Sequence, residues 1–388
     1  MESPSSFCTA LRIPIGAWGM CLVAALAVAQ APARADVVQA RGARLEGGLG
    51  FADGQLAVAG KPVAWKDVLY VIRAQRTRSI RAPEALRMTS GELWFVDLQS
   101  LSGKTLKVRF MLSGAREIDL KLVHAIDFLP GLEPPRPEDK VGALHREKGE
   151  PIPGSLLWID SDRLAIDSPL GVLTLDRSGS SRYLFGNKLA PSGDSHEVSL
   201  VDGTTLRGKV APVKGGVEIE HAVLGKLVIP ERALRSVLRR VDGAVSLAAI
   251  APRSVKAVPL VASGVAPEVV RYAESGGTPA WPGGLECLRG IRIQPKTTVT
   301  YRLPGQGGRK AVLMTTLSPV GRARGDVQVR FAAGGKAILE RKLGPEHKSE
   351  TLALDVPAGA DLAVEVDFGP RIAFPCGVML GDPHVVLR

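Results

Sequence analysis

The residue types that could perform catalysis or bind a metal are scattered along this 388-residue chain. Six histidines occur, none with a second histidine within four residues: His124, His145, His196, His221, His347 and His384. A metal site built locally needs ligands at such short spacing, so the sequence predicts no metal centre. The serine-elbow, zinc-protease, phosphate-loop and dinucleotide motifs are absent from the sequence. We therefore expect no catalytic residues and no cofactor.

Acidic residues are the remaining candidates for chemistry, because two carboxylates about 5–9 Å apart can hydrolyse glycosides. The acids of the C-terminal region instead occupy alternate positions of apolar segments, where they are predicted to point into solvent: Glu340, Asp355, Glu365 and Asp367. This placement favours a binding protein over an enzyme. A diverged glycoside hydrolase is the weaker alternative.

Apolar and polar side chains alternate through most of the last hundred residues. Four segments change face at every residue: Gly325–Phe331, Lys336–Glu340, Thr351–Val356 and Asp361–Asp367. This period of two is typical of strands with one buried face, and glycine- and proline-rich turns separate the segments. The sequence predicts an antiparallel β-sandwich here and an all-β fold for the whole chain.

The composition agrees with many short strands joined by tight turns, since the chain has 43 glycines, 28 prolines and 45% hydrophobic residues. The net charge of +11 is spread out, without a run of five basic residues. We expect no nucleic-acid partner, because Trp65, Trp94 and Trp158 lie among apolar neighbours and are predicted to be core residues.

Residues 1–35 have the pattern of a secretory signal peptide. Arg12 precedes an apolar stretch, 13–29, and Ala33-Arg34-Ala35 offers the small-x-small pattern that signal peptidase cuts. The mature chain would then begin at Asp36, without an integral membrane span, in the periplasm, on the cell surface or outside the cell. An uncleaved anchor is the alternative, because about 17 apolar residues approach a spanning length.

Cleavage would leave two cysteines, Cys287 and Cys376. In an oxidising compartment an isolated pair predicts one disulfide, and closing a loop of this size contributes about 4 kcal/mol. Two buried thiols are the alternative.

A pattern of short strands recurs about every 40 residues before position 242. A glycine opens a strand, an Asp-Gly or Ser-Asp turn follows, and an apolar-Gly hairpin leads to a last strand. The copy seen most clearly comprises Asp202–Val210, Val217–Glu220, Leu224–Pro230 and Leu234–Leu238. The pattern resembles the Sm-like small β-barrels. Open hairpins of this size are unstable, so each unit must curl into a barrel or pair with another copy.

These observations divide the chain after the leader into three parts joined by two linkers. We predict two small β-barrel-like units in 36–130 and two further units in 151–242. A proline-rich linker, 131–150, separates the pairs, and a second linker, 243–270, precedes a C-terminal domain at 271–388.

Five segments of the C-terminal domain follow one another in an order that a known family shares: Leu285–Ile293, Thr298–Leu303, Gly325–Phe331, Gly334–Lys336 and Asp361–Val366. In these segments the domain resembles the NPCBM family of carbohydrate-binding modules, whose fold is a galactose-binding-like jelly roll. The resemblance implies that this domain binds carbohydrate. The last segment departs from the family, because Gly381 and Asp382 keep its polar turn whereas Leu380 stands at the aromatic position.

Sugar recognition needs an aromatic face and planar polar side chains. The candidates in this domain are Trp281, Arg289, Arg292, Tyr301, Asp382 and His384. We expect an exported, non-catalytic protein that binds carbohydrate or another polymer of the bacterial cell envelope, with protein partners at its N-terminal units. A purely structural or protein-interaction role at the envelope is the main alternative.

Overall fold

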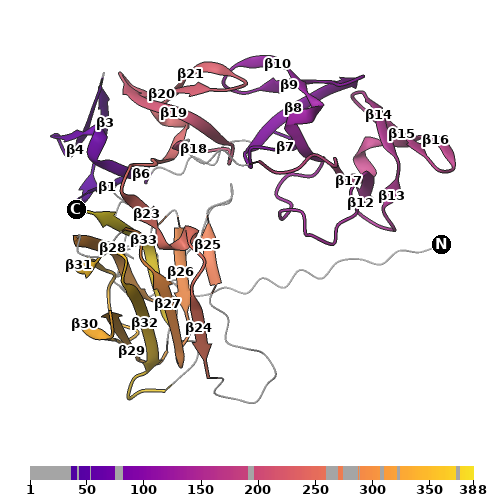
Figure 1. Cartoon of the computed structure of the whole chain (residues 1–388). Helices are drawn as coiled ribbons and strands as arrows, with labels where there is room; N and C mark the ends of the chain where they lie inside the picture. The colour runs from indigo at the N-terminus through magenta and orange to yellow at the C-terminus, as the bar shows by residue number, and fades with distance from the viewer. Residues whose placement is uncertain are drawn as a thin grey trace, which may run out of the picture. The chain divides into compact units, whose positions relative to one another are not determined.

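The structure is a computed structural model that describes residues 36–388 apart from positions 42, 53, 75–81, 191–195, 259–269, 274–286, 288, 306–309, 321–323 and 373–375. Of residues 270–273 it describes the backbone alone. The predicted leader, 1–35, lies outside the described residues. The regular structure of the described part consists of strands and five three-residue 3₁₀ helices, which confirms the all-β prediction (Figure 1). No helix in these ranges has the length and apolar character that crossing a bilayer requires.

The first and fourth predicted units share one antiparallel sheet, with the strand order β2-β1-β6-β22-β18-β19-β20-β21. Its strands are β1 (Asp36–Ala40), β2 (Arg44–Gly47), β6 (Val68–Ile72), β18 (His196–Leu200), β19 (Thr205–Val213), β20 (Gly216–His221), β21 (Gly225–Pro230) and β22 (Leu234–Leu238). A separate three-stranded sheet of the first unit consists of β3 (Leu49–Ala52), β4 (Gln55–Val58) and β5 (Lys61–Ala64).

The second and third predicted units share another sheet, with the order β13-β12-β17-β11-β7-β8-β14-β15-β16, to which β9 and β10 add beside β8. Its strands are β7 (Glu84–Met88), β8 (Leu93–Ser102), β9 (Thr105–Phe110), β10 (Gly114–Asp119), β11 (Val123–Asp127), β12 (Ala143–Arg146), β13 (Ile152–Pro153), β14 (Ser155–Ile159), β15 (Arg163–Ser168), β16 (Gly171–Asp176) and β17 (Ser180–Leu184).

The closing strands of the four units join them in pairs. A 3₁₀ helix stands directly before each closing strand: η1 (Trp65–Asp67) before β6, η2 (Leu120–Leu122) before β11, η3 (Arg177–Gly179) before β17 and η4 (Glu231–Ala233) before β22. Strand β6 pairs with β22, and β11 pairs with β17. The first unit is therefore completed by the fourth and the second by the third, and side chains from all four enter one apolar core.

The predicted linker 131–150 is part of this structure rather than a free spacer. The guanidinium of Arg87 donates to the carbonyl of Leu132 at 2.6 Å, and Arg182 donates to the carbonyl of Glu133 at 2.6 Å. Further along, β12 pairs with β17. The prolines of this segment argued against a strand in the sequence. The two arginines that hold the loop come from distant segments, so their contacts could not be predicted.

The C-terminal sandwich consists of two antiparallel sheets (Figure 1). One has the order β25-β26-β33-β28-β31 with β23 beside β33, and the other has the order β24-β27-β32-β29-β30. The first contains β23 (Ala244–Ser246), β25 (Val270–Ala273), β26 (Arg289–Ile293), β28 (Lys310–Pro319), β31 (Glu350–Pro357) and β33 (Val378–Leu387). The second, called the five-stranded sheet below, contains β24 (Ser254–Ala257), β27 (Thr297–Arg302), β29 (Val327–Ala333), β30 (Lys336–Leu343) and β32 (Asp361–Phe368).

Alternation along each strand separates the core of the sandwich from its outer face. Val329, Phe331 and Val364 of the five-stranded sheet pack with Leu313 and Leu380 of the other sheet, all fully buried. Burying one such side chain contributes about 1.5–3 kcal/mol. The residues between them point outward, as the sequence predicts.

The sandwich begins earlier than predicted, because parts of the expected second linker are strands. Ala244–Ser246 pairs with β33, and Ser254–Ala257 pairs with β27. Between them the 3₁₀ helix η5 (Leu247–Ala249) places Leu247 in the sandwich core. These strands are three and four residues long, too short to show a period in sequence.

A buried ion pair holds the second and third units together and gives a first prediction. Asp127 is 1% exposed and lies 2.8 Å from Nε of Arg87 and 2.5 Å from Nε of Arg182. Asp127→Asn removes the buried counter-charge that both guanidinium groups contact and leaves Arg182 only Asp139 at 4.0 Å, so we expect a loss of about 3–5 kcal/mol in the free energy of unfolding. The matched control Glu117→Gln breaks an exposed pair with Lys107 in the same sheet and should cost less than about 1 kcal/mol.

Urea unfolding of the full chain, followed by tryptophan fluorescence, measures both changes. Equal losses for the two variants would contradict the role assigned to Asp127.

Candidate binding site on the C-terminal sandwich

Three of the predicted site residues, Arg289, Asp382 and His384, lie close together on β26 and β33, but they form a buried cluster. The backbone N–H of Arg289 donates to Oδ1 of Asp382 at 2.8 Å, and Nδ1 of His384 lies 2.8 Å from the carbonyl oxygen of Asp382. A carbonyl only accepts, so this nitrogen carries the proton. Asp382 and His384 are 3% and 5% exposed, and the ring of Tyr70 lies 5.9 Å from that of His384. Neither Asp382 nor His384 offers a surface to a sugar.

Burial governs the titration of this cluster. The pKa of His384 is lowered from its ordinary 6.5 to about 4, mainly by desolvation and to a smaller extent by the nearby Arg289, while the hydrogen bond to the carbonyl of Asp382 acts in the opposite direction. Desolvation also raises the pKa of Tyr70 well above 10, and the Asp382 carboxylate acts in the same direction. His384 is therefore neutral at physiological pH.

The remaining predicted residues, Tyr301, Arg292 and Trp281, do not form an exposed site in the part of the chain that the structure describes. Tyr301 is 0% exposed in the sandwich core, so the expectation that its ring meets a sugar is wrong: alternation along β27 turns it inward. Arg292 is half-buried on β26, and Trp281 lies outside the described residues.

The predicted disulfide between Cys287 and Cys376 is not formed. Cys376 is a buried thiol, and desolvation raises its pKa. Cys287 is equally buried, at 3% exposure. The sequence shows that two cysteines are present but does not show where their sulfur atoms lie relative to each other.

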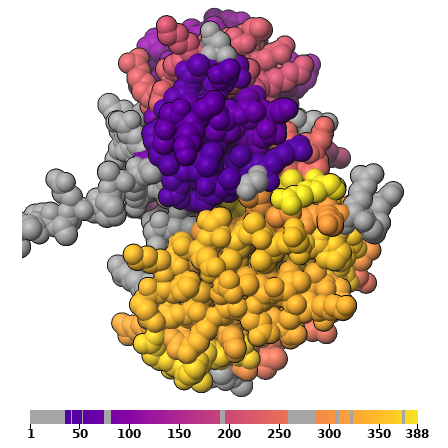
Figure 2. All heavy atoms as spheres, turned by 90° about the vertical axis from the view of Figure 1, so that its left-hand side faces the viewer, coloured from indigo at the N-terminus to yellow at the C-terminus, as the bar shows by residue number. Residues whose placement is uncertain are grey.

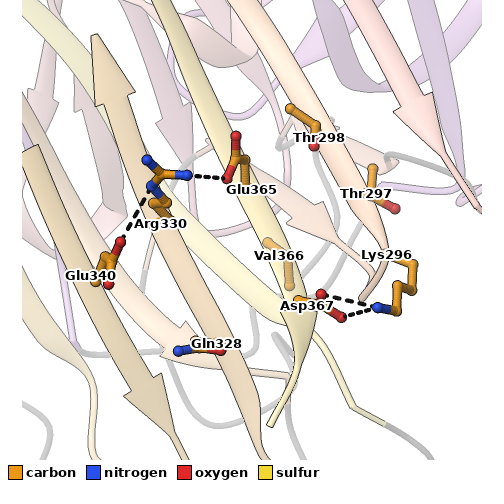
Figure 3. Close-up of a pocket in the computed structure, with 9 residues that line it drawn as sticks. All are labelled: Lys296, Thr297, Thr298, Gln328, Arg330, Glu340, Glu365, Val366 and Asp367. Atoms are coloured by element: carbon orange, nitrogen blue, oxygen red, sulfur yellow. Dashed lines mark hydrogen bonds and ion pairs between the residues drawn. The ribbon is translucent and has the colours of Figure 1, made fainter. Parts of the chain in front are cut away.

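A polar site in the described part of the sandwich lies on the outer face of the five-stranded sheet. A depression of about 390 Å³ opens there between β27, β32, β29 and β30. Its lining is polar apart from Val366: Lys296, Thr297, Thr298, Gln328, Arg330, Glu340, Glu365, Val366 and Asp367 (Figure 3). Figure 2 shows the sandwich from one side as a broad, gently rounded surface. We call this depression the sheet-face site.

Ion pairs fix the side chains of the sheet-face site. Arg330 lies 3.3 Å from a carboxylate oxygen of Glu340 and 3.3 Å from one of Glu365, on the strands to either side (Figure 3). Nζ of Lys296 lies 2.9 and 3.0 Å from the two carboxylate oxygens of Asp367. These five side chains are between 40% and 59% exposed, so a ligand can reach them.

Lys296 and Asp367 show how the ends of the strands shape the site. Lys296 has a φ of 60°, which costs a residue with a Cβ about 1–2 kcal/mol, and this turn directs its side chain onto β32 (Figure 3). The hydrogen bond from Lys296 lowers the pKa of Asp367, and the Phe368 N–H acts in the same direction. Asp367 is therefore an anionic acceptor at neutral pH.

The arrangement can form hydrogen bonds in several directions at once. Carboxylates accept, guanidinium and ammonium groups donate, and the Gln328 amide and Thr298 hydroxyl do both. Exposed ion pairs of this kind contribute only about 0–1 kcal/mol to stability, so exchanging part of them for a polar ligand costs little. The described residues contain no group of acids, histidines and cysteines suited to a metal ion.

The alternating pattern of the sequence predicted the outward positions of the acids of this site correctly but did not reveal the site itself. Glu340, Glu365 and Asp367 were predicted to be solvated, and their exposure confirms that orientation. Gln328 and Arg330 alternate with buried residues of β29 in the same way. Planar polar side chains at outward positions were therefore a usable signal, but the register that aligns three strands was not readable.

No protein-family model matches the sequence, and no curated protein matches it either. Among solved structures the chain is similar to a CBM51 module from Clostridium perfringens GH95 in complex with methyl-galactose. That similarity has 15% identity and a TM-score of 0.30, and it covers 37% of this chain and 99% of that one.

Two further similar structures contain CBM51 modules. The tandem CBM51 modules of a family 98 glycoside hydrolase from Streptococcus pneumoniae have 10% identity and a TM-score of 0.31, over 78% of this chain and 88% of that one. The second is CBM51-2 with GlcNAc and INT domains of Clostridium perfringens ZmpB, at 12% identity and a TM-score of 0.31, over 47% of this chain and 44% of that one. Such low scores carry no conclusion about what this chain binds, and the NPCBM and Sm-like resemblances stay predictions.

The buried histidine gives a prediction about pH. The unfolded chain takes up a proton at His384 as pH falls below 6.5, whereas the folded chain resists it until about pH 4. Stability is therefore lost as pH falls through this window, by up to about 3 kcal/mol from this residue. His384→Gln should remove that share of the pH dependence, while His145→Gln, at a half-buried position of β12, should leave it unchanged.

Urea unfolding at pH 7 and pH 4.5 measures the difference for wild type and both variants. An unchanged pH dependence in His384→Gln, with a native circular-dichroism spectrum, would contradict the burial of a neutral imidazole.

Proposed function

We propose that this protein is an exported, non-catalytic binding protein of the bacterial cell envelope whose C-terminal sandwich binds carbohydrate at the sheet-face site. The observation that carries the proposal is a group of exposed planar side chains on three adjacent strands: Gln328, Arg330, Glu340, Glu365 and Asp367. Ion pairs hold all of them except Gln328 in place. Sugar hydroxyls both donate and accept, and such planar groups meet them in pairs. No aromatic side chain lines the sheet-face site, so recognition there would rest on the hydroxyls rather than on the aromatic face expected from the sequence.

Rigidity of the sheet supports the same function. Gln328 and Arg330 alternate with Val329 and Phe331, which are fully buried. The backbone beneath the polar groups is therefore fixed by the core, and a ligand need not order it on binding. Binding without such ordering suits a site whose individual contacts are weak.

The carboxylates of the site favour binding over hydrolysis. A glycosidase needs one carboxyl group that carries a proton at working pH. Asp367 is held in its charged form by Lys296, and Glu340 and Glu365 both pair with Arg330. These roles support a site that recognises hydroxyls rather than one that protonates a glycosidic oxygen.

A structural or protein-interaction role is the second candidate, favoured by exposed apolar residues on the N-terminal region. Leu170 is 89% exposed and Val172 is 62% exposed, at the hairpin into β16, the edge strand of its sheet. Exposed apolar groups beside an open strand edge are suited to contact with another protein.

Glycan binding is tested by comparing Arg330→Ala with Arg341→Ala in the full chain. Both arginines are about equally exposed and both form ion pairs, but Arg341 pairs with Glu350 away from the site. Defined oligosaccharides on an array identify a ligand, and titration calorimetry then measures its affinity. We expect Arg330→Ala to weaken binding about 10- to 100-fold, as for loss of hydrogen bonds to a charged group, and Arg341→Ala to leave it within about twofold.

The measurement also separates the two candidates. Binding that is equal in the two variants would place the glycan elsewhere on the chain. Silence of the wild-type protein across the array would reject carbohydrate binding in favour of the protein-interaction role.

A further inference from the structure

Outward side chains of the five-stranded sheet line up in a row that crosses all five strands. The register pairs Lys256 with Thr298, and Thr298 with Glu365. It then pairs Glu365 with Arg330, and Arg330 with Glu340. This first row therefore places one polar side chain on each strand, from β24 to β30.

A second row runs beside the first. Asp367 is paired with Gln328, and Gln328 with Lys342. Thr297 and Val366 lie between the two rows and are paired in register. Both are 2% exposed, so their backbone forms the floor between the rows. The two rows flank a strip of the sheet that runs across the strands, and we call this strip, which includes the sheet-face site, the trough.

We propose, building on the carbohydrate-binding function above, that the ligand is an extended stretch of neutral glycan lying in this trough and crossing the strands. Neighbouring strands are about 4.8 Å apart, which is close to the length that one pyranose ring adds to an extended chain. Successive sugar residues therefore lie over successive strands, and each meets the side chain that its strand contributes.

The charges of the trough select a neutral ligand. Arg330 is shared by Glu340 and Glu365, and Lys296 is paired with Asp367. The lining holds two cations and three carboxylates, each in contact with an opposite charge, so its net charge is −1 and it does not attract an anion. Of the two lysines that the rows add outside this lining, Lys342 lies 4.0 Å from Asp326, and Lys256 stands at the far end of the first row. A hydroxyl can accept from the cation and donate to the carboxylate of one pair. A sugar carboxylate cannot donate, and it would lie beside three carboxylates that repel it.

The experiment uses the full chain and a series of neutral oligosaccharides, two to six residues long, of the type found on the array. The same series with each primary alcohol oxidised to a carboxylate tests the charge selection. Two variants shorten the row at its ends: Lys256→Gln on β24 and Glu340→Gln on β30. Glu350→Gln, which alters an ion pair outside the trough, is the matched control.

We expect the dissociation constant to fall about twofold to tenfold per added residue, as for one or two hydrogen bonds, and to level off at about five residues, one for each strand. The oxidised series should bind at least about tenfold more weakly. Each end variant should weaken the binding of the longest oligosaccharide about twofold to tenfold. The binding of a disaccharide should be weakened by at most one of the two variants. Glu350→Gln should change the binding of neither ligand.

The outcomes separate this inference from the function on which it rests. Affinity that is independent of length, or equal for the oxidised series, would overturn the extended neutral ligand and leave carbohydrate binding intact. If no member of either series binds, the proposed function itself is rejected.

Discussion

Backbone hydrogen bonds between closing strands are the constraint on which the N-terminal structure depends. A unit of about 40 residues cannot bury both faces of its own hairpins, so each closing strand pairs with that of another unit, β6 with β22 and β11 with β17. Pairing the first unit with the fourth returns the chain to its beginning and produces one core from all four units. Buried ion pairs such as Asp127 with Arg87 and Arg182 then fix which units meet.

The same backbone pairing positions the candidate site of the sandwich. Strand pairing sets the register, and the register alone decides that Glu365, Arg330 and Glu340 stand side by side. A slip of one residue would turn Val329 outward and Arg330 into the core, which the cost of burying a charge forbids. The apolar inner face therefore determines the polar outer face, although the two never touch.

Sequence was informative where a single strand carries the signal and silent where two distant segments must meet. Alternation predicted β29, β30, β31 and β32 and the outward direction of their acids. It did not predict β23 and β24, which are too short to show a period, nor the loop held by Arg87 and Arg182. Asp382 and His384 were wrongly predicted to be exposed binding residues, because a polar turn is normally exposed. Here the packing of β6 against β33 covers them.

A shallow trough has consequences for affinity that a deep pocket would not have. Its hydrogen bonds compete with water, so each adds only about 0.5–1.5 kcal/mol, and a single sugar gains too little to offset its lost freedom. A polymer of identical residues is different, because the chain can occupy the same rows in many overlapping registers and rebind before it diffuses away. A closed pocket binds one end of a chain, so the chain cannot move from one register to the next. An open surface that crosses the strands is therefore better suited than a closed pocket to the weak binding of a long glycan.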